Sequence, residues 1–494
     1  MRASDPETLA RKIIELCADC DQCRDFMKDT PCLFFAELYR LHDKEQQHGT
    51  PITSGELKDL LDLCNMCGLC SCPGVRADIL RAKDAFIARD GLRPAIRILE
   101  DVQLIGRLCG AYPRLANLLA QNGPVGGVLK TLAGIHPERK LPRFPPEGFD
   151  PWARRRGLHR KRAGTGRKVA YFAGCTARYL FPEVAKAAVE VLERSGVEVY
   201  FPEQKCCGMP SLLEGDRAFT FSVAGFNLQR LADVVQDGYD VVCSCPTCGY
   251  VLKNMFSEGA CYSESYRASL KSEAPGAPAG GSGASGAARP GVARAGGAPG
   301  RSRSSSSMAL MLAGLLKGES EGSHFGFTQE LLLGGYLKDE SYFAPLDGAK
   351  RISISSHTYD LGEYLQELDR SGELNRKLGP VTDRVAYYPP CHLKEQNIGQ
   401  PWWELLGLVP DLPMEKVGGV FDCCGIAGIM GFKREFHETS VQMGSRLAEK
   451  IKAANPQKVL CDCLSCRIQF DQLLPHEVRH PVEILEESYR AYRG

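Results

Sequence analysis

Alternating apolar and polar positions predict two α/β segments with the same layout. Short apolar runs indicate strands, and the amphipathic stretches between them indicate helices. In the first segment the expected order is strand 168–173, helix 182–194, strand 197–201, helix 216–235 and strand 240–242. In the second it is strand 384–388, helix 402–408, strand 414–417, helix 432–453 and strand 458–460. The shared order predicts a duplicated α/β domain.

The rest of the chain divides by composition. Residues 1–90 carry helical patterns, and residues 91–166 combine amphipathic helix with a basic linker. The amphipathic helix is expected to pack between domains, with a membrane-surface helix as the alternative. The basic linker is expected to be a solvated surface, with docking to an acidic partner or to anionic lipid headgroups as the alternative. A stretch rich in Gly, Ala, Ser and Pro, residues 274–307, is expected to be a disordered insert. The expected domains are therefore 1–90 (helical), 91–166 (linker), 167–262 (first α/β), 263–345 (insert and connector) and 346–494 (second α/β).

Charge and length exclude some classes of function. The 494 residues include 61 basic and 60 acidic ones, so net charge gives no reason to expect nucleic acid or a strongly acidic partner. The longest apolar run, 308–316, is about half of the ~20 residues that a helix needs to cross a bilayer. No apolar signal-peptide core precedes Cys17. We therefore expect a cytoplasmic protein without a transmembrane segment.

The 22 cysteines change the picture most. Each α/β segment contains a single cysteine, a Cys-Cys-Gly triplet and a closing C-x-x-C, separated by 30 and 37 residues in the first segment and by 31 and 38 in the second. These groups follow strands, at the sheet edge where α/β folds bind ligands. The two sets are Cys175, Cys206, Cys207, Cys245 and Cys248, and Cys391, Cys423, Cys424, Cys463 and Cys466. Five thiolates exceed what one tetrahedral zinc accepts, which favours an iron–sulfur cluster.

Two C-x-x-C-x-x-C runs lie in the N-terminal stretch. Bacterial ferredoxins use such runs, and a later cysteine of each run ligates the other cluster. On that pattern one [4Fe–4S] cubane takes Cys17, Cys20, Cys23 and Cys72, and the other takes Cys64, Cys67, Cys70 and Cys32. The spacing departs from the ferredoxin pattern, because eight residues separate Cys23 from Cys32 and one separates Cys70 from Cys72.

The repeated pattern resembles the CCG domain of heterodisulfide reductases, of glycolate oxidase iron–sulfur subunits and of the C subunits of anaerobic glycerol-3-phosphate dehydrogenases. The segments 390–394, 422–426 and 480–486 are similar to the second such domain, and 134–145 is similar to the connector before the first. The resemblance implies a helical two-cluster ferredoxin domain followed by two α/β CCG domains. It also implies one or two further [4Fe–4S] clusters, which are non-cubane in the heterodisulfide reductase branch, at the ten repeat cysteines.

Other readings of these side chains stay open. Structural zinc is the alternative at every cysteine group, most of all in the repeats. The additional thiols Cys243 and Cys461 are interpreted as strand-end cysteines, with spare ligation as the alternative. Cys109 and Cys261 are interpreted as small hydrophobic residues. His392 and His480 are interpreted as hydrogen-bonded structural histidines.

The motifs leave three functional hypotheses. No G-x-G-x-x-G or P-loop is present, so we expect no flavin or nucleotide in this chain and a partner that performs hydride chemistry. The first hypothesis is an electron-transfer subunit of an anaerobic-type oxidoreductase, between a flavoprotein dehydrogenase and a quinone or a membrane quinone- or haem-reactive subunit, with peripheral attachment to the cytoplasmic face. The second is a disulfide reductase, and the third is a zinc-stabilised scaffold. Catalytic residues cannot be assigned on these patterns.

Overall fold

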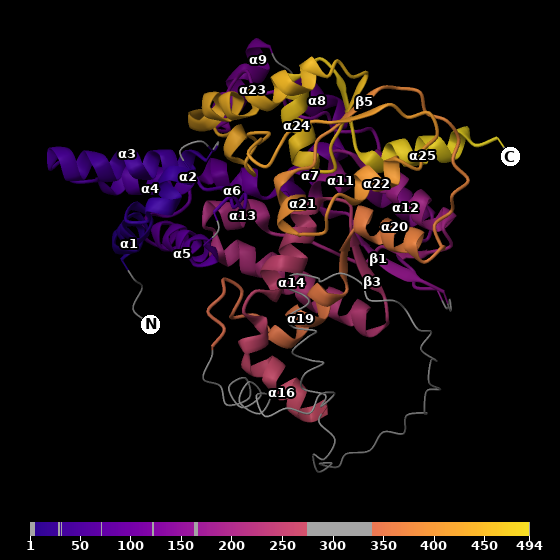
Figure 1. The fold of residues 1–494 in the computed structure, drawn as a ribbon, viewed down its shortest axis with the longest axis horizontal. Coiled ribbons are helices and arrows are strands. Elements are labelled where there is room, and N and C mark those ends of the chain that lie inside the picture. Colours follow the sequence, from indigo (N-terminus) through magenta and orange to yellow (C-terminus); the bar gives the residue numbers. More distant parts are fainter. Residues whose placement is uncertain are drawn as a thin grey trace.

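A computed structural model describes residues 5–27, 30, 32–70, 72–120, 123–162, 166–273 and 338–493. The predicted insert 274–307 and the apolar run 308–316 lie outside these ranges. Figure 1 shows the N-terminal helices on one side of two α/β units that pack against each other. No helix in the described ranges combines the length and the apolar character that crossing a bilayer demands.

The N-terminal helices pack around a core of their own. They are α1 (Pro6–Ala18), α2 (Asp21–Met27), α3 (Leu33–His48), α4 (Ser54–Asp62) and α5 (Pro73–Asp90). A capping box, in which Thr53 and Glu56 bond each other's backbone N–H, starts α4. Leu57, Leu60 and Leu61 of α4 are buried in the core between these helices. The loops between the helices carry most of the N-terminal cysteines.

Within the described residues, the first sheet has four parallel strands in the order β2-β1-β3-β4. They are β1 (Lys168–Phe172), β2 (Glu198–Tyr200), β3 (Asp240–Cys243) and β4 (Thr358–Asp360). The crossover helices are α12 (Pro182–Arg194) and α14 (Arg217–Gln236). The first three strands lie where the apolar runs predict them. β4 was not predicted, because no cysteine group follows it to mark the end of a strand. It lies in the part of the chain after residue 338 and pairs with β3.

The second sheet repeats this order as β6-β5-β7-β8 in the same part of the chain. Its strands are β5 (Val385–Tyr387), β6 (Met414–Lys416), β7 (Lys458–Leu460) and β8 (Glu477–Arg479). Its helices are α22 (Pro401–Leu406), α23 (His437–Ala453), α24 (Leu464–Leu473) and α25 (Pro481–Ala491). The helix predicted from residue 432 begins later, since Lys433 is extended between two 3-10 turns. The matching strand order confirms the duplication.

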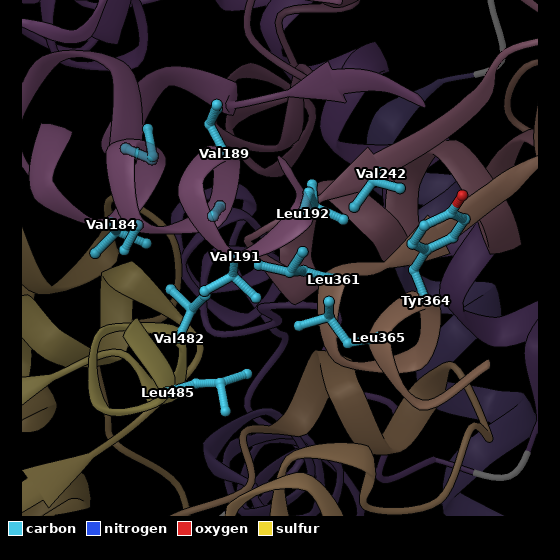
Figure 2. Packing of buried hydrophobic residues seen from close by; sticks show 14 of the residues in the cluster. Val184, Val189, Val191, Leu192, Val242, Leu361, Tyr364, Leu365, Val482 and Leu485 are labelled. Atoms are coloured by element: carbon cyan, nitrogen blue, oxygen red, sulfur yellow. The ribbon is translucent and has the colours of Figure 1, made fainter. Parts of the chain in front are cut away.

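One apolar core joins the two repeats. It contains residues of α12, α25 and α20 (Leu361–Arg370), all buried. Figure 2 shows Val184 and Val191 of α12 next to Val482 and Leu485 of α25. Burying side chains of this size stabilises the assembly by about 1.5–3 kcal/mol each. The two repeats are therefore held as one body, which fixes the distance between their cysteine groups.

The helices after α5 do not pack as expected. They are α6 (Pro94–Glu100), α7 (Val102–Ala111), α8 (Pro113–Ala120) and α9 (Pro124–Leu132). The expectation that their amphipathic pattern packs between domains is wrong for much of their apolar surface, because Leu108, Leu118 and Leu132 are 63%, 66% and 77% exposed. Only one side of α7 is covered, where Gly106 lies against Tyr179 of α11 (Gly174–Tyr179).

The basic linker after α10 (Phe149–Arg155) is an exposed surface with internal ion pairs. The pairs are Arg155 with Glu147, Arg156 with Glu193, Lys161 with Asp237, and Arg167 with Glu373. Such exposed pairs contribute little to stability, because solvent screens them. Part of the linker's charge is thus matched within the chain.

Candidate metal centres

The repeat cysteines lie where strands give way to helices. Cys175 follows β1 in α11, and Cys245 and Cys248 follow β3 at the start of α15 (Pro246–Gly249). Gly174 and Gly208 have positive φ, and a Cβ on Gly174 would lie 2.8 Å from the Cys248 sulfur. The backbone thus approaches the thiol group more closely than a side chain would allow, which explains glycine at this turn.

The first repeat brings its five thiols together in a buried group. The Sγ atoms of Cys206 and Cys175 are 3.6 Å apart. Hydrogen bonds from Cys206 and then Cys248 lower the pKa of Cys207 to about 6. All five thiols are buried. A set of sulfur donors with so little access to water suits a thiophilic metal or cluster.

The second repeat forms a corresponding group. The Sγ atoms of Cys466 and Cys424 are 3.0 Å apart, and the backbone N–H of Gly425 donates to the Cys423 sulfur at 3.4 Å. Burial, with the neighbouring Cys424, raises the pKa of Cys391 to about 12. A neutral thiol in such a place loses its proton only when a cation replaces it, so metal binding here would release protons.

The N-terminal cysteines form two groups, and each group joins one C-x-x-C-x-x-C run with the cysteine that follows the other run. Burial and then the Cys23, Cys72 and Cys20 thiols raise the pKa of Cys17 to about 12. Burial raises the pKa of Cys32 to about 11, with Cys64 adding to the effect. Cys72 thus lies beside the first run and Cys32 beside the second. That these thiols ligate clusters stays a prediction.

The second N-terminal group adjoins the second repeat. Cys32, Cys64, Cys67 and Cys70 line a cavity of about 100 Å³ together with Cys391 and Cys423. Burial raises the pKa of Cys67 well above its ordinary value, and the nearby Cys32 and Cys391 thiols add to the shift. Predicted ligands of the second N-terminal cluster and of the second repeat therefore line the same cavity.

The two repeats meet at their own thiol groups. A hydrogen bond from Cys463 helps to lower the pKa of Cys245, after the larger effect of Cys248. The Thr247 hydroxyl lies 3.8 Å from the Cys463 sulfur. A second cavity, of about 130 Å³, is lined by cysteines of both repeats. The cysteine groups thus follow one another from the second N-terminal run to the second repeat and then to the first.

Three polar contacts fix the N-terminal run against the repeats. Arg76 of α5 pairs with Glu395 at 2.6 Å. The buried Lys83 donates to the carbonyl oxygens of Cys64 at 3.0 Å and of Leu213 at 2.7 Å. His392 contacts the Met66 carbonyl oxygen at 3.2 Å. Because these partners are buried or half-buried, the contacts hold the groups in place more strongly than surface pairs would.

A buried arginine tests whether the second repeat suits an anionic cluster. Arg139 is fully buried, and its Nη1 donates to Gln469 at 2.6 Å, whereas Nε and Nη2 have no hydrogen-bond partner among the described residues. Its guanidinium lies 4.9 Å from the centre of the Phe432 ring, which carries no negative charge. Burial lowers its pKa to about 10, against the opposing effect of Cys424. A buried cation without a counter-charge is costly, and a cluster held by thiolates would supply that charge. Arg139 and the thiols of the second repeat therefore suit an anionic iron–sulfur cluster.

Both histidines are hydrogen-bonded, as interpreted from the sequence, whereas the additional thiol Cys461 is hydrogen-bonded to the thiol of Cys466 in the second repeat. The rings of His392 and Tyr250 stack at 5.0 Å, and His392 Nδ1 contacts the Thr247 hydroxyl at 2.9 Å. His480 caps α25 and its Nε2 contacts the Ser244 carbonyl oxygen at 3.0 Å. Cys243 and Cys461 are fully buried at strand ends. Cys109 and Cys261 are partly buried, apart from the four groups.

Comparisons with known proteins agree with this arrangement. The family model of the cysteine-rich CCG domain matches residues 169–253 and 385–471. The chain is 23% identical over 403 residues to the C subunit of anaerobic glycerol-3-phosphate dehydrogenase from Escherichia coli K12, covering 81% of this chain and 78% of that protein. It is 23% identical over 336 residues to the B subunit of fumarate reductase (CoM/CoB) from Methanothermobacter marburgensis, covering 66% of this chain and 47% of that protein. It is also 23% identical over 326 residues to lactate utilization protein A of Bacillus pumilus, covering 64% of this chain and 98% of that protein.

Proposed function

Since this chain contains two CCG cysteine-rich domains and is homologous to the C subunit of anaerobic glycerol-3-phosphate dehydrogenase and the B subunit of fumarate reductase (CoM/CoB), we propose that it is an electron-transfer component of an oxidoreductase complex. A flavoprotein dehydrogenase supplies electrons. A quinone, or a membrane subunit that reacts with quinone or haem, accepts them. The relatives named as subunits of a dehydrogenase and of a reductase support a partner of this kind.

The observation that carries the proposal is the row of thiol groups. Cys67 of the second N-terminal run is beside Cys391 of the second repeat, and Cys463 of that repeat is beside Cys245 of the first. Iron–sulfur clusters, when bound, exchange one electron at a time. The chain's own contribution is to fix these groups through the shared core and to bury all the repeat thiols except Cys391 and Cys423, which are partly exposed. A relay needs groups that are held at fixed separations and largely shielded from water.

Iron content is the first measurement. We expect anoxically purified protein to be brown and to contain about sixteen irons per chain, if all four groups hold [4Fe–4S] clusters. Zinc replacing iron at close to one atom per group would contradict the cluster interpretation of that group. Elemental analysis of the same sample used for electron paramagnetic resonance compares the two metals directly.

A disulfide reductase is the second candidate, because the cavity between the repeats is lined by thiols of both. A relay and a reductase differ in what oxidises the reduced protein. We expect the dithionite-reduced full chain to be oxidised rapidly by a water-soluble quinone and to release no thiol from cystine. Stopped-flow absorbance measures the first reaction, and thiol titration measures the second.

Cys206→Ser tests the relay, and Cys261→Ser is its matched control because the same chemical change is made outside the thiol groups. Cys206 belongs to the group at the end of the row, whereas Cys261 lies outside the four groups. The first change should slow oxidation by quinone and the second should leave it unchanged. Stoichiometric thiol release from cystine, with slow reaction with quinone, would replace the relay by the reductase.

A further inference from the structure

The α7–α9 helices carry the largest run of exposed apolar side chains in the described part of the chain. We define the α7–α9 face by its residues that are at least 39% exposed: Leu104, Leu108, Tyr112, Leu115, Leu118, Leu119, Val125, Val128, Leu129 and Leu132. Helical spacing places them on one side of each helix, and α8 contacts both α7 and α9. Soluble proteins seldom expose so many large apolar side chains together, so such a face indicates an interaction surface.

The charged side chains within α7–α9 are all basic, although Glu183 and Asp471 line a pocket with Arg143 beside α8. Between Asp101 and Glu138 the sequence has no acidic residue. Arg107 and Arg114 are exposed, as is Arg143, which lies in the segment that Asn117 of α8 binds through the Phe144 backbone. None of these three arginines forms an ion pair within the described residues. Unpaired cations at the edge of an apolar face complement anionic lipid headgroups.

The other side of α7 adjoins the first repeat's thiol group. Val102 lines the cavity between the repeats, and Gln103 donates to the Gln204 carbonyl oxygen at 3.4 Å. Gln204 in turn accepts from the N–H of Gly174, next to Cys175, at 3.2 Å. The thickness of one helix, roughly 10–12 Å, thus separates the α7–α9 face from the last thiol group of the row.

We propose that the α7–α9 face binds the surface of an anionic bilayer, with its apolar side chains at the headgroup boundary and its arginines on the phosphates. Tyr112, between α7 and α8, has the amphipathic ring that is enriched at that boundary. In this orientation the first repeat faces the phase in which a lipid-soluble acceptor is dissolved. That consequence rests on the proposed relay function, whereas bilayer binding itself does not.

Vesicle flotation of the full chain under anoxic conditions tests the proposal. We expect the protein to float with vesicles of equal parts phosphatidylcholine and phosphatidylglycerol, and more weakly with phosphatidylcholine alone. Leu118→Asp and Leu132→Asp should each lower the partition coefficient roughly tenfold or more, because a charge replaces an exposed leucine that would enter the headgroup boundary. Arg107→Gln and Arg114→Gln should each lower binding to the anionic vesicles roughly fivefold.

Tyr492→Asp is the matched control, because Tyr492 is also an exposed large side chain but lies at the opposite end of the chain. It should float like the parent, and every variant should keep the parent's iron content. A parent protein that fails to float would overturn the proposal. So would Leu118→Asp and Leu132→Asp variants that float unchanged. If those variants instead abolish a dimer seen by sedimentation, without any flotation, the face is an interface between copies. Flotation without quinone oxidation would contradict only the relay.

Discussion

Cys424→Ser is expected to remove the cluster that we propose for the second repeat and to stop electron transfer between the N-terminal groups and the first repeat. Cys424 lies 3.0 Å from Cys466 on the turn before Gly425, and the spare thiol near this group, Cys461, is hydrogen-bonded to Cys466 from another loop, after β7. The second repeat stands between the second N-terminal run and the first repeat. Loss of its cluster should therefore lower the transfer rate by orders of magnitude while the other three groups keep their iron.

Electron paramagnetic resonance of the reduced variant measures which signals are lost, and stopped-flow absorbance measures the transfer. Cys206→Ser should remove the first repeat's cluster and leave transfer into the second repeat intact. Cys261→Ser makes the same chemical change away from the groups and should alter neither reading. A Cys424→Ser protein with the parent's full set of signals would mean that the second repeat binds no redox-active iron.

Gly425→Ala is expected to destabilise the protein far more than Gly208→Ala, although the two glycines occupy equivalent turns. Both have positive φ, at +85° and +94°, which costs an alanine about 1–2 kcal/mol. At Gly208 the added Cβ meets a methyl group of the Val223 side chain at 3.2 Å, a contact that a shift of a few tenths of an ångström relieves. At Gly425 it would clash with the backbone oxygen of Ser440 and lie 2.9 Å from the Gly444 nitrogen, which adds about 1–3 kcal/mol of overpacking.

The apparent melting temperature at one fixed scan rate, with iron loading measured beside it, compares the two variants. A fixed rate is needed because unfolding that releases iron is not reversible. The Gly425→Ala protein should melt at a clearly lower temperature and lose iron from the second repeat. An equal drop in melting temperature in both variants would show that α23 can move away from the turn. The close backbone contact would then not be the reason why position 425 requires glycine.

Sequence patterns predict the strands that carry cysteines and miss those that do not. Apolar runs in the sequence cover β1 and β5, and the cysteine after each strand marks where the chain turns into a helix. β4 and β8 have three residues each, and no cysteine group follows them. Short edge strands such as β4 and β8 form because they pair with a neighbouring strand, β3 or β7. The pattern of residues within the edge strand does not show that this partner is present.

The spacing of the cysteines also predicts which groups lie together. Cys72 lies beside Cys17, and Cys32 beside Cys64, in spite of the unusual spacing. The patterns do not give the contacts between groups, because Cys67 reaches Cys391 only through the tertiary fold. The same limit explains α7–α9. Amphipathicity shows that a helix has an apolar side, but whether protein, lipid or water faces that side depends on what packs there.

The contact between α5 and the second repeat has a consequence for biogenesis. Arg76 and Glu395, whose ion pair helps to close the cavity around the second N-terminal group, are 319 residues apart in the chain. The N-terminal helices leave the ribosome and fold first, while Cys67 and Cys70 still lack the wall that Cys391 and Cys423 provide. A cluster bound there would be most accessible to an assembly factor during translation, before the last repeat docks. Because the four thiols of this group stay partly exposed in the complete fold, docking of the last repeat narrows access to them without closing it.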